Sequence, residues 1–570
     1  MSTIQPISNV LAANRGEIAV RIFRACTELG LKTTAIYSWE DRLSIHRYKA
    51  DRAYQIGKKG APVASYLDQE ALIALALKRG VDAIHPGYGF LSENADFAAR
   101  VIDAGLTWIG PSPETMRALG DKVSARKVAQ EAGVPVVPGS NGAIESVEEA
   151  KAFAKTFGFP VLLKAAHGGG GRGMRVVNSM DTLGDAFDSA QREALAAFGS
   201  PELFIERYLD KPRHIEVQIL GDQHGNIVHL FERDCSVQRR HQKVVEIAPA
   251  PELPDEVRQK LYDYSLRIAK HVNYYSAGTV EFLVQPKADS DEYEIFFIEV
   301  NTRIQVEHTV TEMITGHDLI KAMIRVAEGY RLSDNEIGIS SQEDISIHGQ
   351  AIQARITTED PENQFAPDSG TIITYRSAAG FGIRLDAGVG GSGAVVLPYY
   401  DSLLVKVSAH GLNLQDAANK LDRSLAEFRI RGVKSNIRFL QNVIRHPTFL
   451  SGQTWTRFVD DTRELFELKP RQDRGNKALK AIGDIIINGP PGSPTKLKRP
   501  APLIEPELPE VPYTAPPESP AYKVFREQGA SALSKWILEQ DQLLITDTTF
   551  RDAHQSLLAT RVRTRDLLDI

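Results

Sequence analysis

Cysteine is scarce in this chain of 570 residues. Cys26 and Cys235 are the only two, which excludes a disulfide framework and a zinc site built from cysteines, and favours a reduced structural role for Cys235. No run approaches about 20 uninterrupted apolar residues, so no membrane span is predicted. The first residues, MSTIQPISNVLAANRGE, lack the apolar core of a secretory signal. A cytoplasmic location is therefore the default prediction.

An excess of positive charge is also missing. The chain has 67 Lys and Arg against 73 Asp and Glu, a formal net charge of -6. This balance gives no general attraction to nucleic acid or to an anionic membrane, so neither partner is expected, and phosphate-binding cations must be clustered locally. The 42% hydrophobic and 25% charged residues are typical of a globular protein, and the length predicts several folding units.

The N-terminal segment alternates strands and helices. Residues 9–38 read as an apolar strand, a turn, an amphipathic helix and a β-branched strand, and GVDAIHPGYGFLSEN carries a second strand into a Gly-rich turn. This alternation predicts a mostly parallel, doubly wound α/β domain over residues 1–120. The turn Asn14-Arg15-Gly16-Glu17 is not GxGxxG, so no dinucleotide site is predicted there.

The rest of the chain changes character three times. Residues 121–205 contain a short apolar strand that runs into a glycine-rich hairpin, and residues 206–455 contain strands with two-residue alternation and several helices. The second region predicts the antiparallel sheet of an α+β domain. Residues 456–540 include a proline-rich tether and the helical segment KVFREQGASALSKWILEQ, and residues 541–570 read as the strand LLIT followed by a helix.

The glycine-rich segment is a candidate phosphate cradle. Glycines permit positive φ, so successive backbone N–H groups can point at one anion. Lys164 precedes the run and Arg172 lies within it, which favours phosphate binding over a flexible linker, although Arg172 alone would also suit a solvated hairpin. The pattern is not a Walker A loop. The glycines concerned are Gly168, Gly169, Gly170 and Gly171.

Two glutamates in apolar strands form a candidate metal site. Glu281 lies in GTVEFLV and Glu299 in FFIEVNTR, with Asn301 two residues further along the same face. Carboxylates in such strands are costly unless they are paired or bound to a cation, and one or two carboxylates with phosphate oxygens are the ligands that Mg²⁺ prefers. The alternative is a pair of carboxylates that form salt bridges with Lys or Arg.

Long strings in the chain resemble the biotin carboxylases of the ATP-grasp superfamily. They are ANRGEIA, HPGYGFLSEN, GDKVSA, KAAHGGGGRGMRVV, ERDCSVQRRHQKVVE, FIEVNTRIQVEHTVTE and TTEDP, and the resemblance extends over about residues 6–455. It implies an ATP-grasp fold with a glycine-rich lid, and ATP- and bicarbonate-dependent carboxylation of biotin with Mg²⁺ or Mn²⁺. The residues that match nucleotide-binding positions are the glycine run and Lys122, Lys164, Glu206, Leu209, His214, Gln238 and His241. Arg207 stands where some relatives have Lys, a change expected to be neutral.

The same resemblance implies the chemical roles. Arg303, Gln305, the Val306 backbone and Lys243 match the bicarbonate cradle, where a planar guanidinium suits a planar anion. Glu307 matches the general base. Arg355 matches the residue that stabilises the biotin enolate; from the residues alone, an ordinary ion pair with Glu359 or Asp360 is the alternative.

The tail LLITDTTFRDAHQSLLATR resembles the opening segment of the carboxyltransferase barrel of pyruvate carboxylases. This implies Asp552 as a ligand of a divalent metal such as Zn²⁺ or Mn²⁺, and Gln555 as a pyruvate contact. A complete barrel needs about 250 residues, and the chain has no Met-Lys-Met biotinylation sequence. We therefore expect biotin to be attached elsewhere, on a separate carrier domain, and the chain to be the front part of a longer protein or a truncated product.

Further partners follow from the family resemblance. Its members form tetramers with dimeric carboxylase contacts, and acetyl-CoA activates them near the junction with the barrel. Arg429, Arg431, Arg471 and Arg474 match basic positions there, although a solvated basic face is the alternative. Two other functions stay open: a truncated chain that binds nucleotide and assembles with full-length subunits, and a separate biotin carboxylase subunit of an acyl-CoA carboxylase.

Overall fold

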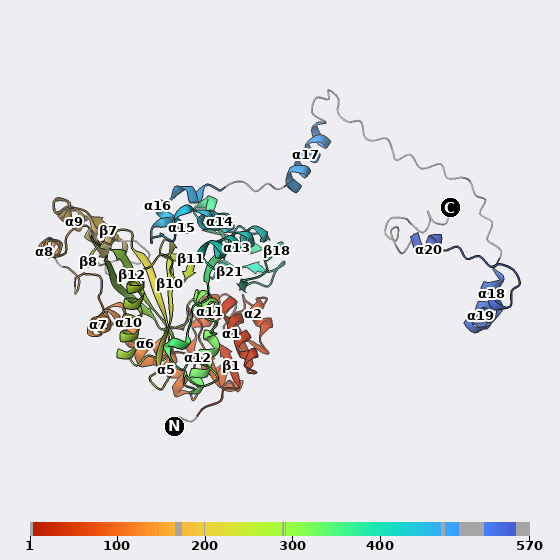
Figure 1. Cartoon of the computed structure of the whole chain (residues 1–570), viewed down its shortest axis with the longest axis horizontal. Helices are drawn as coiled ribbons and strands as arrows, with labels where there is room; N and C mark the ends of the chain where they lie inside the picture. Colours follow the sequence, from red (N-terminus) through yellow and green to blue (C-terminus); the bar gives the residue numbers. More distant parts are fainter. Residues whose placement is uncertain are drawn as a thin grey trace. The chain divides into compact units, whose positions relative to one another are not determined.

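The computed structural model describes residues 4–140, 142–144, 146–165, 174–198, 200–287, 290, 292–468, 474–489 and 518–553. The chain forms two compact units, Met1–Lys469 and Pro470–Ile570, which are considered separately. Figure 1 labels their helices and strands. Among the described residues, no helix is both long and apolar enough to cross a membrane.

The first unit begins with a five-stranded parallel sheet in the order β3-β2-β1-β4-β5. Neighbouring residues of β1 point into different cores: Val10 packs with α1 and α12, whereas Leu11 packs with α3 to α6. Apolar residues on both faces explain the continuous hydrophobic strand, and the predicted doubly wound class is confirmed. The strands are β1 Asn9–Ala12, β2 Lys32–Tyr37, β3 Arg52–Gln55, β4 Ala83–His85 and β5 Thr107–Trp108, and the helices are α1 Gly16–Glu28, α2 Ile45–Lys49, α3 Pro62–Leu67, α4 Gln69–Lys78, α5 Ala95–Asp103 and α6 Pro113–Gly120.

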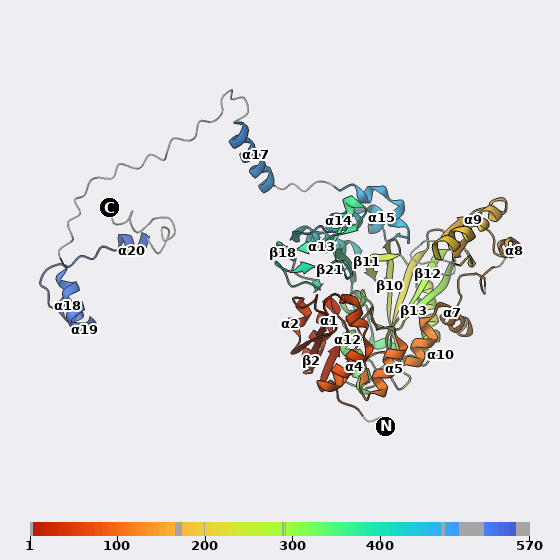
Figure 2. The ribbon, with the colours of Figure 1, turned by 180° about the vertical axis from the view of Figure 1, so that it is seen from behind.

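A small three-stranded antiparallel sheet, which we call the lid sheet, follows. Its order is β7-β6-β8, and α8 and α9 pack on it through a separate apolar cluster that includes Leu163 and Phe187. Figure 2 shows these elements at one end of the unit. The predicted glycine run, Gly168 to Gly171, lies outside the described residues. The elements are α7 Lys122–Glu131, α8 Val147–Phe157, β6 Val161–Ala165, β7 Met174–Val177, α9 Met180–Phe198 and β8 Leu203–Arg207.

The largest sheet has eight strands in the order β13-β12-β9-β10-β11-β14-β21-β19, and all neighbours are antiparallel. The predicted antiparallel α+β region is therefore confirmed. One face is apolar: Ile215, Val217 and Ile219 pack under α10. Alternate residues of the same strand, His214, Glu216 and Gln218, point to the opposite face, where α11 packs. The strands are β9 Arg213–Gly221, β10 Ile227–Arg239, β11 Gln242–Ala248, β12 Ser276–Pro286, β13 Tyr293–Asn301, β14 Gln350–Thr357, β19 Ile383–Ala387 and β21 Leu403–Gly411.

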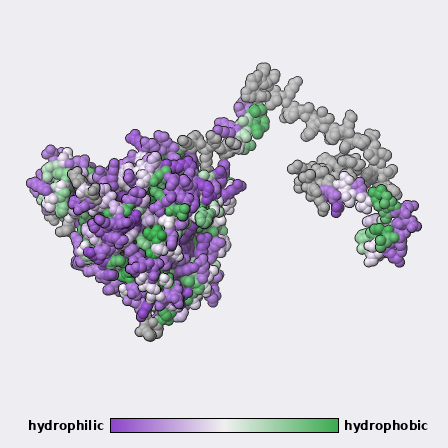
Figure 3. Space-filling model, viewed as in Figure 1, coloured by the Kyte–Doolittle hydropathy of each residue, from purple (hydrophilic) through white to green (hydrophobic). Residues whose placement is uncertain are grey.

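Helices and short strands complete the first unit. The helices are α10 Asp255–His271, α11 His308–Thr315, α12 Leu319–Glu328, α13 Leu414–Glu427, α14 Ile437–Arg445, α15 Pro447–Leu450 and α16 Phe458–Asp461, with 3-10 turns η1 Gln342–Asp344, η2 Pro361–Asn363 and η3 Arg463–Phe466. The short strands are β15 Glu359–Asp360, β16 Ala366–Pro367, β17 Gly370–Thr371, β18 Thr374–Arg376, β20 Val395–Val396 and β22 Arg429–Arg431. The face of the unit seen in Figure 3 is mostly hydrophilic.

The described part of the second unit is helical and differs from the sequence prediction in two places. The segment predicted as one helix forms two, α18 Pro520–Gln528 and α19 Ala530–Leu538, because Gly529 has a φ of 84° that interrupts the helix. Leu543–Thr546, predicted as a strand, has no strand conformation, since no described strand pairs with its backbone groups. The remaining helices are α17 Arg474–Asn488 and α20 Thr549–Ala553.

Candidate active site

One open cleft of about 2000 Å³ lies in the first unit. Its walls come from the turn after β1, the lid sheet, the polar face of the eight-stranded sheet and the loop between β13 and α11. Every predicted carboxylase residue that the structure describes lines this cleft: Lys122, Lys164, Glu206, Leu209, His214, Gln238, His241, Lys243, Glu281, Glu299, Asn301, Arg303, Gln305, Val306, Glu307 and Arg355. Lys122 and Arg355, which are 233 positions apart in sequence, thus line one space.

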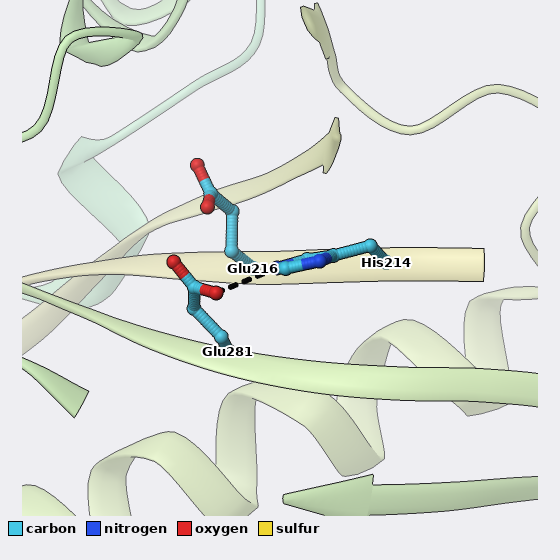
Figure 4. A group of neighbouring side chains, drawn as sticks. All are labelled: His214, Glu216 and Glu281. Atoms are coloured by element: carbon cyan, nitrogen blue, oxygen red, sulfur yellow. Dashed lines mark hydrogen bonds and ion pairs between the residues drawn. The ribbon is translucent and has the colours of Figure 1, made fainter. Parts of the chain in front are cut away.

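Charged residues form a row across four strands at the floor of the cleft. Arg233, Glu216, Glu281 and Glu299 are successive cross-strand partners on β10, β9, β12 and β13. Figure 4 shows His214, Glu216 and Glu281 on their adjacent strands. His214 Nε2 lies 2.7 Å from Glu281 Oε2. The row explains why carboxylates occur inside apolar strands, because the two-residue alternation directs them all to one face.

Lys243 on β11 balances most of this negative charge. Its Nζ lies 2.9 Å from Glu281 Oε1 and 2.7 Å from Glu307 Oε1, and it also contacts Glu216. Burial opposes a charged lysine, but these carboxylates raise its pKa well above the usual value. An ammonium held by buried carboxylates stays charged at neutral pH.

Glu281 and Glu299, the pair predicted to hold a metal, are cross-strand neighbours on β12 and β13. Burial raises the pKa of Glu299, and the neighbouring negative charge of Glu281 raises it further. Asn301 Nδ2 donates a hydrogen bond to Glu281 Oε1 at 2.8 Å. The clusters His214–Glu216–Glu281 and Glu216–Cys235–Glu307 also have ligand-like spacing. Lys243 contacts Glu216, Glu281 and Glu307, so the salt bridge that was the alternative from the sequence is present at Glu281.

Glu307 and Arg355 face each other across the cleft floor. Burial alone would raise the pKa of Glu307, but the nearby Lys243, Arg355 and Arg233 cations hold it far below the usual range. Arg355 Nη2 lies 3.1 Å from Glu307 Oε2, and its Nε donates to Glu246 Oε1 at 2.6 Å. These partners replace the ion pair with Glu359 or Asp360 that was the alternative from the sequence.

Arg303 lies between the metal candidates and the N-terminal region. Its Nη2 donates to Asn301 Oδ1 at 2.8 Å, and its Nε is 3.0 Å from Glu93 Oε2. Gln305 is in turn held by two groups of the floor: its Nε2 donates to Glu281 at 2.7 Å and its Oε1 accepts from Arg233 at 2.9 Å. The loop is thereby fixed to the charged row.

On the lid side, Lys164 forms an ion pair with Glu206. Arg207 makes two parallel hydrogen bonds to Glu294, at 2.8 and 2.9 Å, which join the lid sheet to β13. An ammonium cannot form this fork, and the expected neutrality of Lys at position 207 stays a prediction. Leu209 is buried, whereas His241 is exposed in the turn between β10 and β11.

Several residues of the site were missed from sequence. Arg233 is fully buried and contacts Glu216, Gln218, Thr311, Thr279 and Gln305. Glu216 and Glu246 bind the cations described above. A signal was present in RHIEVQILG, where polar residues occupy alternate positions 214, 216 and 218 of an otherwise apolar strand.

Of the predicted barrel and activator residues, Arg429 and Arg431 belong to the first unit, and neither lines this cleft. Asp552 lies in α20 of the second unit, where it accepts hydrogen bonds from Thr548 and Arg551, and Gln555 is outside the described residues. Arg429 and Arg431 are exposed on β22. Arg474 begins α17, and Arg471 is not among the described residues.

Three family models match consecutive parts of the first unit. Residues 6–116 match the biotin carboxylase N-terminal domain, 121–335 the ATP-binding domain of the carbamoyl-phosphate synthase L chain, and 353–461 the biotin carboxylase C-terminal domain. The pyruvate carboxylase of Bacillus subtilis is 52% identical over 99% of this chain. That match covers 49% of the relative, so the chain spans about half the length of the curated relatives it matches.

Solved structures define the class as an ATP-grasp ligase. The biotin carboxylase domain dimer of Hydrogenobacter thermophilus 2-oxoglutarate carboxylase, in complex with MgADP, ADP and bicarbonate, superposes with a TM-score of 0.73. It is 45% identical, and the match covers 82% of this chain and 100% of that domain. Rhizobium etli pyruvate carboxylase with acetyl coenzyme-A gives a TM-score of 0.75 at 50% identity, over 99% of this chain and 50% of that one. The chain belongs to the biotin carboxylase family.

Proposed function

We propose that this chain uses ATP and bicarbonate to carboxylate biotin, the first half-reaction of a pyruvate carboxylase. The observation that carries the proposal is the single cleft in which a lysine pair, two in-register carboxylates, a guanidinium and a glutamate base candidate converge. Similarity to a domain solved with MgADP and bicarbonate supports the same ligands here.

The nucleotide would lie between the lid sheet and the floor of the cleft. Lys122 and Lys164 would bind its phosphates together with the glycine run from Gly168 to Gly171. The backbone of Glu206 and Leu209 would bind the adenine edge. His214, Gln238 and His241 would lie around the ribose and phosphates. The Lys164–Glu206 ion pair supports this role, because it holds the Lys164 side chain at the cleft wall.

Glu281, Glu299 and Asn301 would hold Mg²⁺ or Mn²⁺. The raised pKa of Glu299 beside Glu281 supports this assignment, since a divalent cation would stabilise both carboxylates in their charged form. The ion would neutralise phosphoryl oxygens of the nucleotide during transfer.

Bicarbonate would lie against Arg303, Gln305, the Val306 backbone and Lys243. A guanidinium fork and an ammonium suit a small planar anion, and both line the same wall. Positioning of this weak nucleophile against the γ-phosphate is the main task, because phosphoryl transfer needs orientation and charge neutralisation more than covalent catalysis.

Glu307 would accept the proton of bicarbonate and, through the released phosphate, that of biotin. Its lowered pKa supports a carboxylate that is ionised at neutral pH. The same cations make it a weak base, so proton transfer requires that Lys243 and Arg355 shift part of their interaction to the bound anions. Arg355 would then stabilise the oxygen of the biotin enolate.

The substitution Glu307→Gln tests this function. It keeps the size of the side chain but removes the proton acceptor, so we expect biotin-dependent ADP formation to fall by at least about 100-fold while nucleotide affinity stays within about twofold. Assays would use free biotin, bicarbonate and MgATP, with nucleotide affinity measured by calorimetry. Glu328→Gln is a matched control, since Glu328 is also buried and ion-paired but lies outside the cleft. Comparable turnover in Glu307→Gln would remove Glu307 from the mechanism.

The wider assignment concerns the whole protein. We propose the domain division 1–120, 121–205, 206–455, 456–540 and 541–570, with the last segment opening a carboxyltransferase barrel that contains Asp552 and Gln555. Transfer to pyruvate would require the rest of that barrel, its divalent metal and a biotinyl carrier. The match to pyruvate carboxylases over 99% of the chain supports this, and the structure of Rhizobium etli pyruvate carboxylase with acetyl coenzyme-A supports an activator site. The domain dimer of the relative supports a homo-oligomer.

A further inference from the structure

Lys406 on β21 is a charged residue beneath the cleft that does not line it. Its side chain is fully buried, with 0% exposure. Its Nζ donates a hydrogen bond to the carbonyl oxygen of Val306 at 3.0 Å and lies 3.0 Å from Glu17 Oε2. A buried ammonium is costly unless it is paired and hydrogen-bonded, so these contacts are the reason it can be there.

Two carboxylates, Glu17 and Asp386, neighbour the Lys406 side chain. Asp386 is its cross-strand neighbour on β19, but Arg384 Nε already donates to Asp386 at 2.8 Å. Glu17 lies in the first turn of α1 and also accepts a hydrogen bond from the hydroxyl of Tyr88. Lys406 therefore ties β21 to the start of α1 and to the loop between β13 and α11.

Lys406 is also the cross-strand neighbour of Arg355 on β14. These two adjacent cations hold consecutive residues of the loop: Lys406 binds the Val306 carbonyl, and Arg355 binds the Glu307 carboxylate. The Val306 carbonyl belongs to the same peptide plane as the Glu307 N–H. Fixing that carbonyl therefore restrains the peptide plane that ends at the Cα atom of Glu307.

We propose that Lys406 is a positioning residue that orients the Val306–Glu307 peptide for reaction with bicarbonate, acting through the loop without touching the substrate. This inference rests on the proposed function, because it assigns a consequence to the bicarbonate cradle. Lys122, Lys164 and His214, which are proposed to bind the nucleotide, lie on elements other than β21 and the loop that contains this peptide, so we expect nucleotide affinity to depend little on Lys406.

The test compares Lys406→Met, which keeps the apolar stem and removes the ammonium, with Lys406→Gln, which retains a hydrogen-bond donor. We expect kcat/KM for bicarbonate to fall about tenfold in the Met variant and less in the Gln variant. Nucleotide affinity, measured by calorimetry, should change by less than about twofold. General destabilisation would not lower kcat/KM for bicarbonate while nucleotide affinity stays the same.

The matched control is Arg258→Met, which removes a cation from the fully buried Glu232 at a place outside the cleft. Retention of kcat/KM for bicarbonate in Lys406→Met, or an equal loss in Arg258→Met, would overturn the positioning role. If Lys406→Met does not fold, the same comparison of kcat/KM for bicarbonate with nucleotide affinity is made for Lys406→Gln. Wild-type protein without any bicarbonate- and biotin-dependent ADP formation would contradict the proposed function itself, which separates the two failures.

Discussion

The two large sheets of the first unit solve the problem of burial differently. In the parallel sheet, both faces are apolar, as the alternating directions of Val10 and Leu11 show. In the antiparallel sheet, one face is apolar under α10, and the other buries the row from Arg233 to Glu299. The parallel sheet is thus held by packing, whereas the polar face of the other depends on matched charge.

This difference teaches where function and stability separate. An apolar contact stabilises the fold because it removes apolar surface from water, and its loss lowers the free energy of unfolding. Such a contact does not bind a charged ligand. A buried ion pair adds little net stability, but it fixes charged groups at defined positions next to the cleft. We therefore expect substitutions in the first sheet to change stability alone, and substitutions on the polar face, which leave a charged partner unpaired, to change chemistry as well.

Leu11→Ala should have the largest effect on stability. Leu11 is fully buried in the parallel sheet, and a cavity at such a site costs about 3 kcal/mol. Urea denaturation should show this loss, while kcat of the remaining folded protein stays within about twofold, because the side chain does not line the cleft. A large drop in kcat of fully folded Leu11→Ala protein would contradict the proposed difference between the two sheets.

Arg355→Ala tests the opposite expectation for the polar face. Loss of the group proposed to stabilise the enolate should reduce biotin carboxylation about 100-fold. Bicarbonate-dependent ATP cleavage without biotin should fall much less. Product analysis with labelled bicarbonate separates the two rates, and Arg445→Ala, at an exposed arginine of α14, serves as control. Equal losses in both reactions would count against the enolate role.

His85 extends the comparison to pH. Burial in the parallel sheet lowers its pKa to about 3, from 6.5 in the unfolded chain. The unfolded state therefore binds more protons between these values, so stability is lost as the pH falls below 6.5. His85→Gln should remove up to about 1.4 kcal/mol per pH unit of that loss, measured by urea denaturation from pH 7 to pH 4.5. Parallel pH profiles for both proteins would contradict this account.

Arg207→Lys should have the smallest effect. The fork to Glu294 is partly exposed, with 30% of the Arg207 side chain and 19% of Glu294 accessible, so its net contribution is at most about 1 kcal/mol. We expect KM for ATP to rise about threefold without a change in kcat, since the fork joins the lid sheet to β13. An unchanged KM would show that one ammonium contact is sufficient there.

The fold was predictable because it follows local rules. The continuous apolar strand NVLAA indicates a sheet covered on both faces, and the alternation in β9 indicates a sheet with unlike faces. The predictions of secondary structure were wrong where one residue, or the lack of a described partner strand, determines the conformation. Gly529 divides a helix that periodicity alone would continue, and Leu543–Thr546 has an apolar strand composition without a described partner strand.

The candidate site was predictable only in part. The resemblance gave the residues that line the cleft, because their motifs are long and ordered along the chain. It gave no cross-strand register, so the alignment of Arg233, Glu216, Glu281 and Glu299 could not be foreseen. Likewise, Lys406 lies 100 positions from Val306, and nothing in either segment specifies that contact.

The burial of Lys243 determines how the ion pairs of the cleft respond to ionic strength. Only 13% of its side chain is exposed, so dissolved salt does not surround the ammonium or the carboxylates that share it. Screening acts mainly on pairs that ions can approach, such as Arg207 with Glu294. The charge pattern of the cleft floor would therefore persist in concentrated salt, while the connection between the lid sheet and β13 would loosen first.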